Sequence, residues 1–148
     1  MTMSIWKTKE VDLAEVRKLE QGNILQHLGI EIVEIGGDFV SGKMPVDHRT
    51  QQPFGILHGG ASVVLAESLG SVASGLVLDW GRQYAVGIEV NANHLRSVSA
   101  GYVYGTAKAV HIGRRSHVWS IEIANDSGKI VCTSRLTMMV LEKPNTRA

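Results

Sequence analysis

One segment limits the possible folds of this chain more than any other. Residues Gly59–Leu78 (GGASVVLAESLGSVASGLVL) run for 20 residues with a single charged side chain, Glu67, near the middle. The length alone permits a transmembrane helix, but four serines, four glycines and Glu67 argue against a lipid environment. We therefore predict a helix buried in a globular domain. Small residues would let a sheet approach it closely: Gly60, Ala61, Ala66, Gly70, Ala73 and Ser74.

The remaining segments are mostly strand-like. Residues Val11–Leu28 have helical periodicity, which Gly22 divides into two short pieces. Six strands are predicted, with Gly36-Gly37 and Asn125–Gly128 as turns between consecutive strands. The strands are Gly29–Ile35, Asp38–Pro45, Gln83–His94, Gly101–Ile112, His117–Ala124 and Lys129–Leu141. Because several exceed the usual length of about 5–6 residues, we predict an α+β fold: a curved antiparallel sheet wrapped around one long central helix.

The composition is that of one globular domain. The 148 residues are 44% hydrophobic and 20% charged, which excludes a disordered chain. We predict a single domain over 1–148, with a frayed tail over about 144–148. A net charge of +1 offers no excess for nucleic acid or an anionic membrane. The N-terminus lacks the apolar core of a signal peptide, and the one cysteine, Cys132, is expected in the core, so we expect a cytoplasmic location.

Glu67 is the first candidate for chemistry. A carboxylate in the middle of a buried helix is costly unless it is paired or useful. A structural ion pair, or a polar crevice, is one explanation. However, no Lys or Arg occurs between Arg49 and Arg82, and the neighbours of Glu67 are the hydroxyl groups of Ser68 and, one turn on, Ser71. This pattern favours a reactive carboxylate.

The start of the same helix is the second candidate. Gly59 and Gly60 leave backbone N–H groups open to an incoming oxygen, as in an oxyanion hole, although two glycines can also simply permit close packing. Gly59 and Glu67 are eight residues apart, about 12 Å along a helix axis. One carbonyl group cannot touch both on the same helix. If both act on one carbonyl they belong to different subunits, which predicts a homodimer with composite sites.

Several motifs resemble the hot-dog-fold acyl-CoA thioesterases. They are Gln52–Ser62 (QPFGILHGGAS) with Leu65–Ser68 (LAES), Gly87–Arg96 (GIEVNANHLR), Val118–Ile123 (VWSIEI) and Ser134–Thr137 (SRLT). The resemblance covers nearly the whole chain. It is to the branch that holds 1,4-dihydroxy-2-naphthoyl-CoA hydrolase, the enterobactin proofreading thioesterase and Arthrobacter-type 4-hydroxybenzoyl-CoA thioesterase. It implies a central helix wrapped in an antiparallel sheet, and dimers that pair into tetramers.

The resemblance also implies roles for particular residues. Glu67 aligns with the catalytic carboxylate, as nucleophile or general base. The Gly59 amide and the Gln52 side chain align with groups that polarise the thioester carbonyl, and His58 with a histidine that positions it. Ser71 aligns with a residue near the acyl group or the attacking water. The substrate-binding candidates are His94 by the acyl pocket, Ser68, and the cations that would meet the CoA phosphates: Arg96, His111, Arg114 and Arg115. A solvated turn is the alternative for the last three.

We therefore expect hydrolysis of an acyl-CoA with an aromatic acyl group, for example 1,4-dihydroxy-2-naphthoyl-CoA in menaquinone biosynthesis. A broad-range or phenylacetyl-CoA thioesterase, or one that proofreads aryl carrier proteins, is the near alternative. Two other classes stay open: a hydratase or dehydratase of acyl thioesters and, ranked last, a non-catalytic acyl-CoA sensor. No metal-binding spacing, serine-hydrolase elbow or phosphate-binding loop is present in the sequence. We expect no metal and no cofactor beyond the CoA of the substrate.

Overall fold

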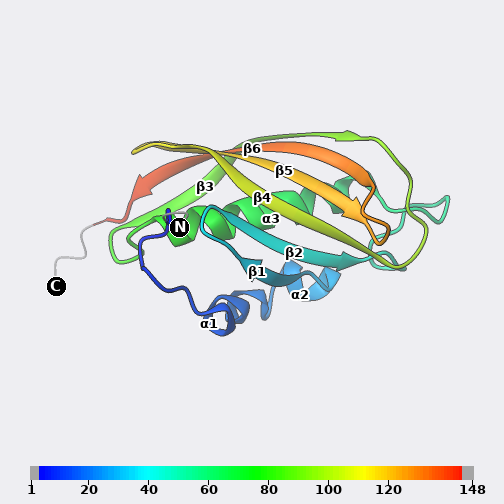
Figure 1. Ribbon diagram of the computed structural model, residues 1–148, viewed down its shortest axis with the longest axis horizontal. Helices are drawn as coiled ribbons and strands as arrows, with labels where there is room; N and C mark the ends of the chain where they lie inside the picture. Colours follow the sequence, from blue (N-terminus) through cyan, green and yellow to red (C-terminus); the bar gives the residue numbers. More distant parts are fainter. Residues whose placement is uncertain (1–3, 145–148) are drawn as a thin grey trace.

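A computed structural model describes residues 4–144; the predicted tail beyond Pro144 lies outside these residues. Three short N-terminal helical pieces come first, followed by a β-hairpin, one long helix and four long strands (Figure 1). The helical pieces are α1 (Leu13–Arg17), the 3-10 helix η1 (Lys18–Glu20), α2 (Ile24–Leu28) and α3 (Gly59–Val77). The strands are β1 (Glu31–Ile35), β2 (Phe39–Pro45), β3 (Gln83–His94), β4 (Tyr102–Ile112), β5 (Ser116–Asn125) and β6 (Ile130–Glu142).

The six strands form one antiparallel sheet in the order β1-β2-β4-β5-β6-β3. The sheet curves along α3, and the short helices α1 and α2 lie beside β1 (Figure 1). The predicted α+β fold, with a curved antiparallel sheet around one long helix, is confirmed. The strand β3 closes one edge of the sheet because its only strand partner among residues 4–144 is β6.

The small residues of the sheet let α3 sit close to it. Leu65, Leu69 and Ala73 on the helix have no solvent exposure. A Cβ atom placed on Gly42 or Gly105 would lie 2.7 Å from a methyl carbon of Leu69, so glycine is required at both contacts. By length and composition α3 could cross a membrane, but it packs against β2–β6 as the core helix, as predicted.

Local signals in the sequence set the ends of the elements. Gly22 has φ +73° and separates η1 from α2, as expected. The turn after β5 is held by Asn125, whose Oδ1 accepts hydrogen bonds from the backbone N–H groups of Ser127 and Lys129. The alternation predicted for the last strand is present, because Cys132, Leu136 and Met138 are buried on one face.

Candidate active site

The start of α3 has one free amide rather than two. His58 is the N-cap residue, and its Nδ1 accepts a hydrogen bond of 2.8 Å from the backbone N–H of Gly60. The Gly60 amide is therefore occupied. The Gly59 amide donates to no atom within the described part of the chain. Of the two predicted oxyanion donors, the local geometry leaves Gly59. Because His58 Nδ1 accepts, the neutral imidazole carries its proton on Nε2.

A pocket of about 370 Å³ opens beside this helix start. Four of the predicted site residues line it: Gln52, Gly59, His94 and Arg96. The side chain of His94 lies directly against the helix, since a Cβ atom on Gly59 would be 2.7 Å from His94 Nε2. Gln52 Oε1 accepts a hydrogen bond from the backbone N–H of Phe54, so the Nε2 group of this pocket residue remains able to donate.

Glu67 lies farther along α3, on the side that faces β3. Its carboxylate is half-buried, and a Cβ atom on Gly87 would lie 2.5 Å from Glu67 Oε1. Within residues 4–144, the carboxylate forms no ion pair. One turn on, the Ser71 hydroxyl donates to Met138 Sδ at 3.8 Å, while Ser68 is half-buried on the same helix. The structural ion pair considered for Glu67 is thus not found among the described residues.

Within one chain, the Gly59 amide and the Glu67 carboxylate lie far apart. The helix is continuous from Gly59 to Val77, so Gly59 and Glu67 keep the separation of about 12 Å that eight residues impose. A hydrogen bond spans about 3 Å. The amide and the carboxylate of one protomer therefore cannot act on the same carbonyl group.

The predicted phosphate-binding cations are not gathered at one place. Arg96 lines the pocket at the helix start. In contrast, His111 lies near the end of β4, and Arg114 and Arg115 belong to the connection of β4 to β5. The two arginines line a separate hollow of about 570 Å³ with the end of β6. Just after this turn, His117 of β5 shares a hydrogen bond with Ser74, which lies near the C-terminal end of α3. This turn therefore lies at the opposite end of α3 from Gly59.

Two buried titratable side chains belong to the interior. Burial lowers the pKa of His117, with a further lowering by His111 and an opposing effect of the Gly113 backbone. Its Nδ1 shares a 3.0 Å hydrogen bond with Ser74 Oγ, which also accepts from Trp119 Nε1 at 2.8 Å. Burial likewise raises the pKa of the Cys132 thiol, which places this residue in the core, as predicted. The described residues contain no group of three His, Cys, Asp or Glu side chains arranged to hold a metal ion.

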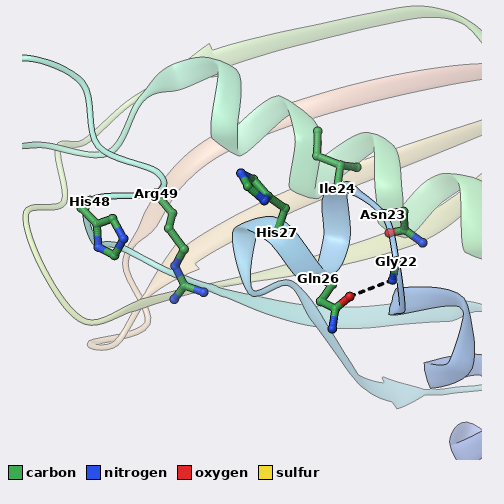
Figure 2. Close-up of a pocket in the computed structure, with 7 residues that line it drawn as sticks. All are labelled: Gly22, Asn23, Ile24, Gln26, His27, His48 and Arg49. Atoms are coloured by element: carbon green, nitrogen blue, oxygen red, sulfur yellow. Dashed lines mark hydrogen bonds between the residues drawn. The ribbon is translucent and has the colours of Figure 1, made fainter.

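A larger hollow, of about 1110 Å³, lies elsewhere (Figure 2). It is formed by α2, including His27, and by His48 and Arg49 in the loop after β2. The Arg49 guanidinium binds Asp47 at 2.7 Å, and this hydrogen bond lowers the pKa of Asp47 to about 2. The charge of Arg49 is therefore already compensated, and none of the predicted site residues lines this hollow.

Sequence reasoning missed two residues that shape the region around Glu67. Gly87 gives the carboxylate its space on β3, and a glycine inside a long strand is a signal for such a close approach. Trp80, in the connection of α3 to β3, lines a smaller cavity next to Ser71. No sequence motif marks this tryptophan, because its place depends on how the connection folds back on the helix.

Known proteins with a similar sequence or structure include several thioesterases. The family model of the thioesterase superfamily matches residues 54–132. The chain is 50% identical to 1,4-dihydroxy-2-naphthoyl-CoA hydrolase of Escherichia coli over 137 residues, 93% of this chain and 99% of that protein. It is 46% identical to the proofreading thioesterase EntH of Cronobacter turicensis over 137 residues, 93% and 98% of the two chains. The crystal structure of a mutant thioesterase from Pseudomonas aeruginosa matches with a TM-score of 0.91 at 48% identity, covering 95% of this chain and 100% of that one.

Proposed function

The chain belongs to the thioesterase superfamily and is a thioesterase of the hot-dog fold, and on that premise we propose that it hydrolyses aromatic acyl-CoA thioesters in the cytoplasm, without a cofactor. The leading substrate is 1,4-dihydroxy-2-naphthoyl-CoA, an assignment that would place the enzyme in menaquinone biosynthesis. The 50% identity to a hydrolase of that name supports it. The 46% identity to a proofreading thioesterase supports a second candidate, the release of wrong acyl groups from an aryl carrier protein.

The proposal rests on the environment of the Glu67 carboxylate. Its carboxylate is half-buried, faces a glycine and forms no ion pair within residues 4–144. A carboxylate in this state can attack the thioester carbonyl carbon or remove a proton from a water molecule that attacks it. The carbon–sulfur bond then breaks, and the CoA thiolate leaves and takes up a proton. If Glu67 attacks the carbonyl carbon directly, the mixed anhydride that forms on its carboxylate is then hydrolysed by water, which regenerates Glu67. By either route the products are a carboxylic acid and free CoA.

The start of α3 supplies the groups that would stabilise the negative oxygen formed during this attack. The Gly59 amide and the Nε2 group of Gln52 are donors at the same pocket. His58 Nδ1 is occupied by the Gly60 N–H, so the Nε2–H group of His58 remains to position the thioester carbonyl. His94 and Arg96 line the pocket as substrate contacts, and His111, Arg114 and Arg115 are candidates for the CoA phosphates.

The active unit is a homodimer, which pairs further into a tetramer. The separation of Gly59 and Glu67 along one helix supports a site in which one chain provides the amide and the other the carboxylate. The strand β3 supports the same arrangement, because its outer edge has no strand partner among residues 4–144. A second copy that pairs with this edge would bring two α3 helices side by side.

Release of free thiol is the test of the activity. Wild type, Glu67→Gln and the control Glu122→Gln, which alters an exposed carboxylate on β5, are assayed with benzoyl-CoA and 1,4-dihydroxy-2-naphthoyl-CoA. Loss of the acid–base group should lower kcat by about 10²–10⁴-fold in Glu67→Gln, while Glu122→Gln keeps wild-type turnover. A Glu67→Gln enzyme that turns over at the wild-type rate would refute the proposed role of Glu67.

A further inference from the structure

A cavity of about 210 Å³ lies one helical turn beyond Glu67. Its lining includes Ser71, Gly75 and Leu78 of the helix side, Ala85 of β3, and Trp80 and Lys143. Ser71 follows Glu67 by four residues, about 6 Å along the axis. Ala85 and Gly87 are alternate residues of β3 and therefore face α3 together. Resting on the proposed thioesterase function, we propose that this cavity receives the ring of the aromatic acyl group, and that Trp80 is the side chain that selects for that ring.

The indole of Trp80 is held in place by its polar end. Its Nε1 donates a hydrogen bond to the backbone carbonyl of Gly75 in the last turn of α3. A Cβ atom on Gly75 would lie 3.2 Å from Cζ2 of the indole, so glycine at this position lets the ring lie close to the helix. The Trp80 carbonyl in turn accepts a hydrogen bond from Lys143 Nζ. The first bond holds the indole ring, and the second holds the backbone that carries it, before any ligand arrives.

The surface that Trp80 leaves free is its aromatic face. The side chain is 49% exposed, whereas Trp6 and Trp119 are buried. Since the indole N–H is already bonded, the free part of the residue offers an apolar π-face, which favours stacking on a second aromatic ring. The Ser71 hydroxyl at the same cavity can bond a ring hydroxyl.

The size of the cavity fits one end of a substrate. Pockets that hold whole drug-sized ligands measure about 300–1,000 Å³, and this one is smaller. It can hold an acyl ring system but not the pantetheine and nucleotide parts of CoA. Those parts would extend away from Glu67, on the other side of the thioester bond.

The test compares an aromatic with an aliphatic acyl group. We would measure kcat/KM for benzoyl-CoA and hexanoyl-CoA with wild type, Trp80→Ala and Trp80→Phe, and with Tyr104→Ala as a control on the exposed face of β4. Loss of the stacking partner should lower kcat/KM for benzoyl-CoA by about two- to tenfold in Trp80→Ala, with a smaller change for hexanoyl-CoA. Trp80→Phe keeps a ring and should retain most of the preference. Equal loss for both substrates would overturn the inference.

A binding measurement separates this inference from the proposed activity. Because Trp80 is the exposed tryptophan among the three, benzoate should shift the tryptophan emission of wild type in a saturable way, and the shift should vanish in Trp80→Phe. This readout needs no turnover. Wild type that releases no thiol yet shows the shift would contradict the proposed function and support the cavity. Normal turnover with an emission shift that persists in Trp80→Phe would contradict the inference alone.

Discussion

The two edges of the sheet differ in whether other parts of the chain cover them. At the β1 edge, the N-terminal segment covers the strand: Glu20 Oε1 accepts a hydrogen bond of 2.6 Å from the backbone N–H of Ile32, and Arg17 binds Glu31 at 3.2 Å. At the β3 edge, no strand among residues 4–144 pairs with the outer side of twelve residues. An unpaired edge attracts other chains. We therefore expect a second copy to pair with the open β3 edge, as the proposed dimer requires.

The local structure of the two edges is otherwise alike. Each edge strand contains an irregularity in its pairing with the neighbouring strand, which leaves Val33 unpaired in β1 and Ile88 unpaired in β3. Both side chains are apolar and exposed, 41% for Val33 and 54% for Ile88. Both edges contain a bulge, so the difference between them is the hydrogen bond by which the Glu20 carboxylate covers β1 (the Glu20 clamp). Val33 and Ile88 are therefore a matched pair of positions at which to test the proposed dimer.

The largest effect is expected from a charge at the open edge. Ile88→Lys places an ammonium group on β3, where it would oppose pairing with a second copy. Because the proposed site needs Gly59 of one chain and Glu67 of the other, thiol release should fall by about 10²-fold or more, the scale of losing an oxyanion donor. Light scattering after gel filtration should show the mass of a monomer.

Val33→Lys is the control for this experiment. The β1 edge is already covered, so this variant should keep both the assembly state and the activity of wild type. If Ile88→Lys stays dimeric and active, or if Val33→Lys dissociates the assembly as well, the assignment of the dimer to the β3 edge is wrong.

A second prediction concerns the clamp at the covered edge. Glu20→Ala removes the acceptor for the Ile32 N–H, which is buried. Leaving such a group without a partner should lower the free energy of unfolding by about 1–3 kcal/mol, measured by urea denaturation. Glu67→Ala is the contrasting variant, since Glu67 forms no ion pair among the described residues and should cost far less stability. Equal losses in both variants would remove the distinction between a structural and a reactive carboxylate.

The sequence predicted the elements near the site better than the clamps at the edges. The glycine pair at Gly59 and the mostly apolar run after it predicted a helix over Gly59–Leu78, one residue longer than α3, because helix signals are local. Glu20 was placed correctly in a helical region, but its partner Ile32 is twelve residues away and is chosen by tertiary packing. The same holds for Trp80, whose indole finds the Gly75 carbonyl only once the connection folds back.

The smallest effect is expected from the interior between the two edges, where acid should weaken the sheet. Burial holds the pKa of His117 below its ordinary value of 6.5. The unfolded chain therefore takes up this proton at a higher pH than the folded chain does. This contribution to stability is complete above pH 6.5 and is lost as the pH falls toward the lower pKa of the folded state, by at most about 1.4 kcal/mol per pH unit.

A buried imidazolium would also disturb the hydrogen bonds around it. Once Nδ1 of His117 carries a proton, Ser74 Oγ must accept from both His117 and Trp119, and its own hydroxyl loses its acceptor there. Urea denaturation of wild type and His117→Gln between pH 7.5 and 5.0 would check this. The stability advantage of wild type should be constant above pH 6.5 and should shrink below it. If the free energies of unfolding of wild type and His117→Gln change in parallel with pH, His117 is not the group that titrates. The Ile88→Lys and Val33→Lys variants could then be compared at any pH in this range.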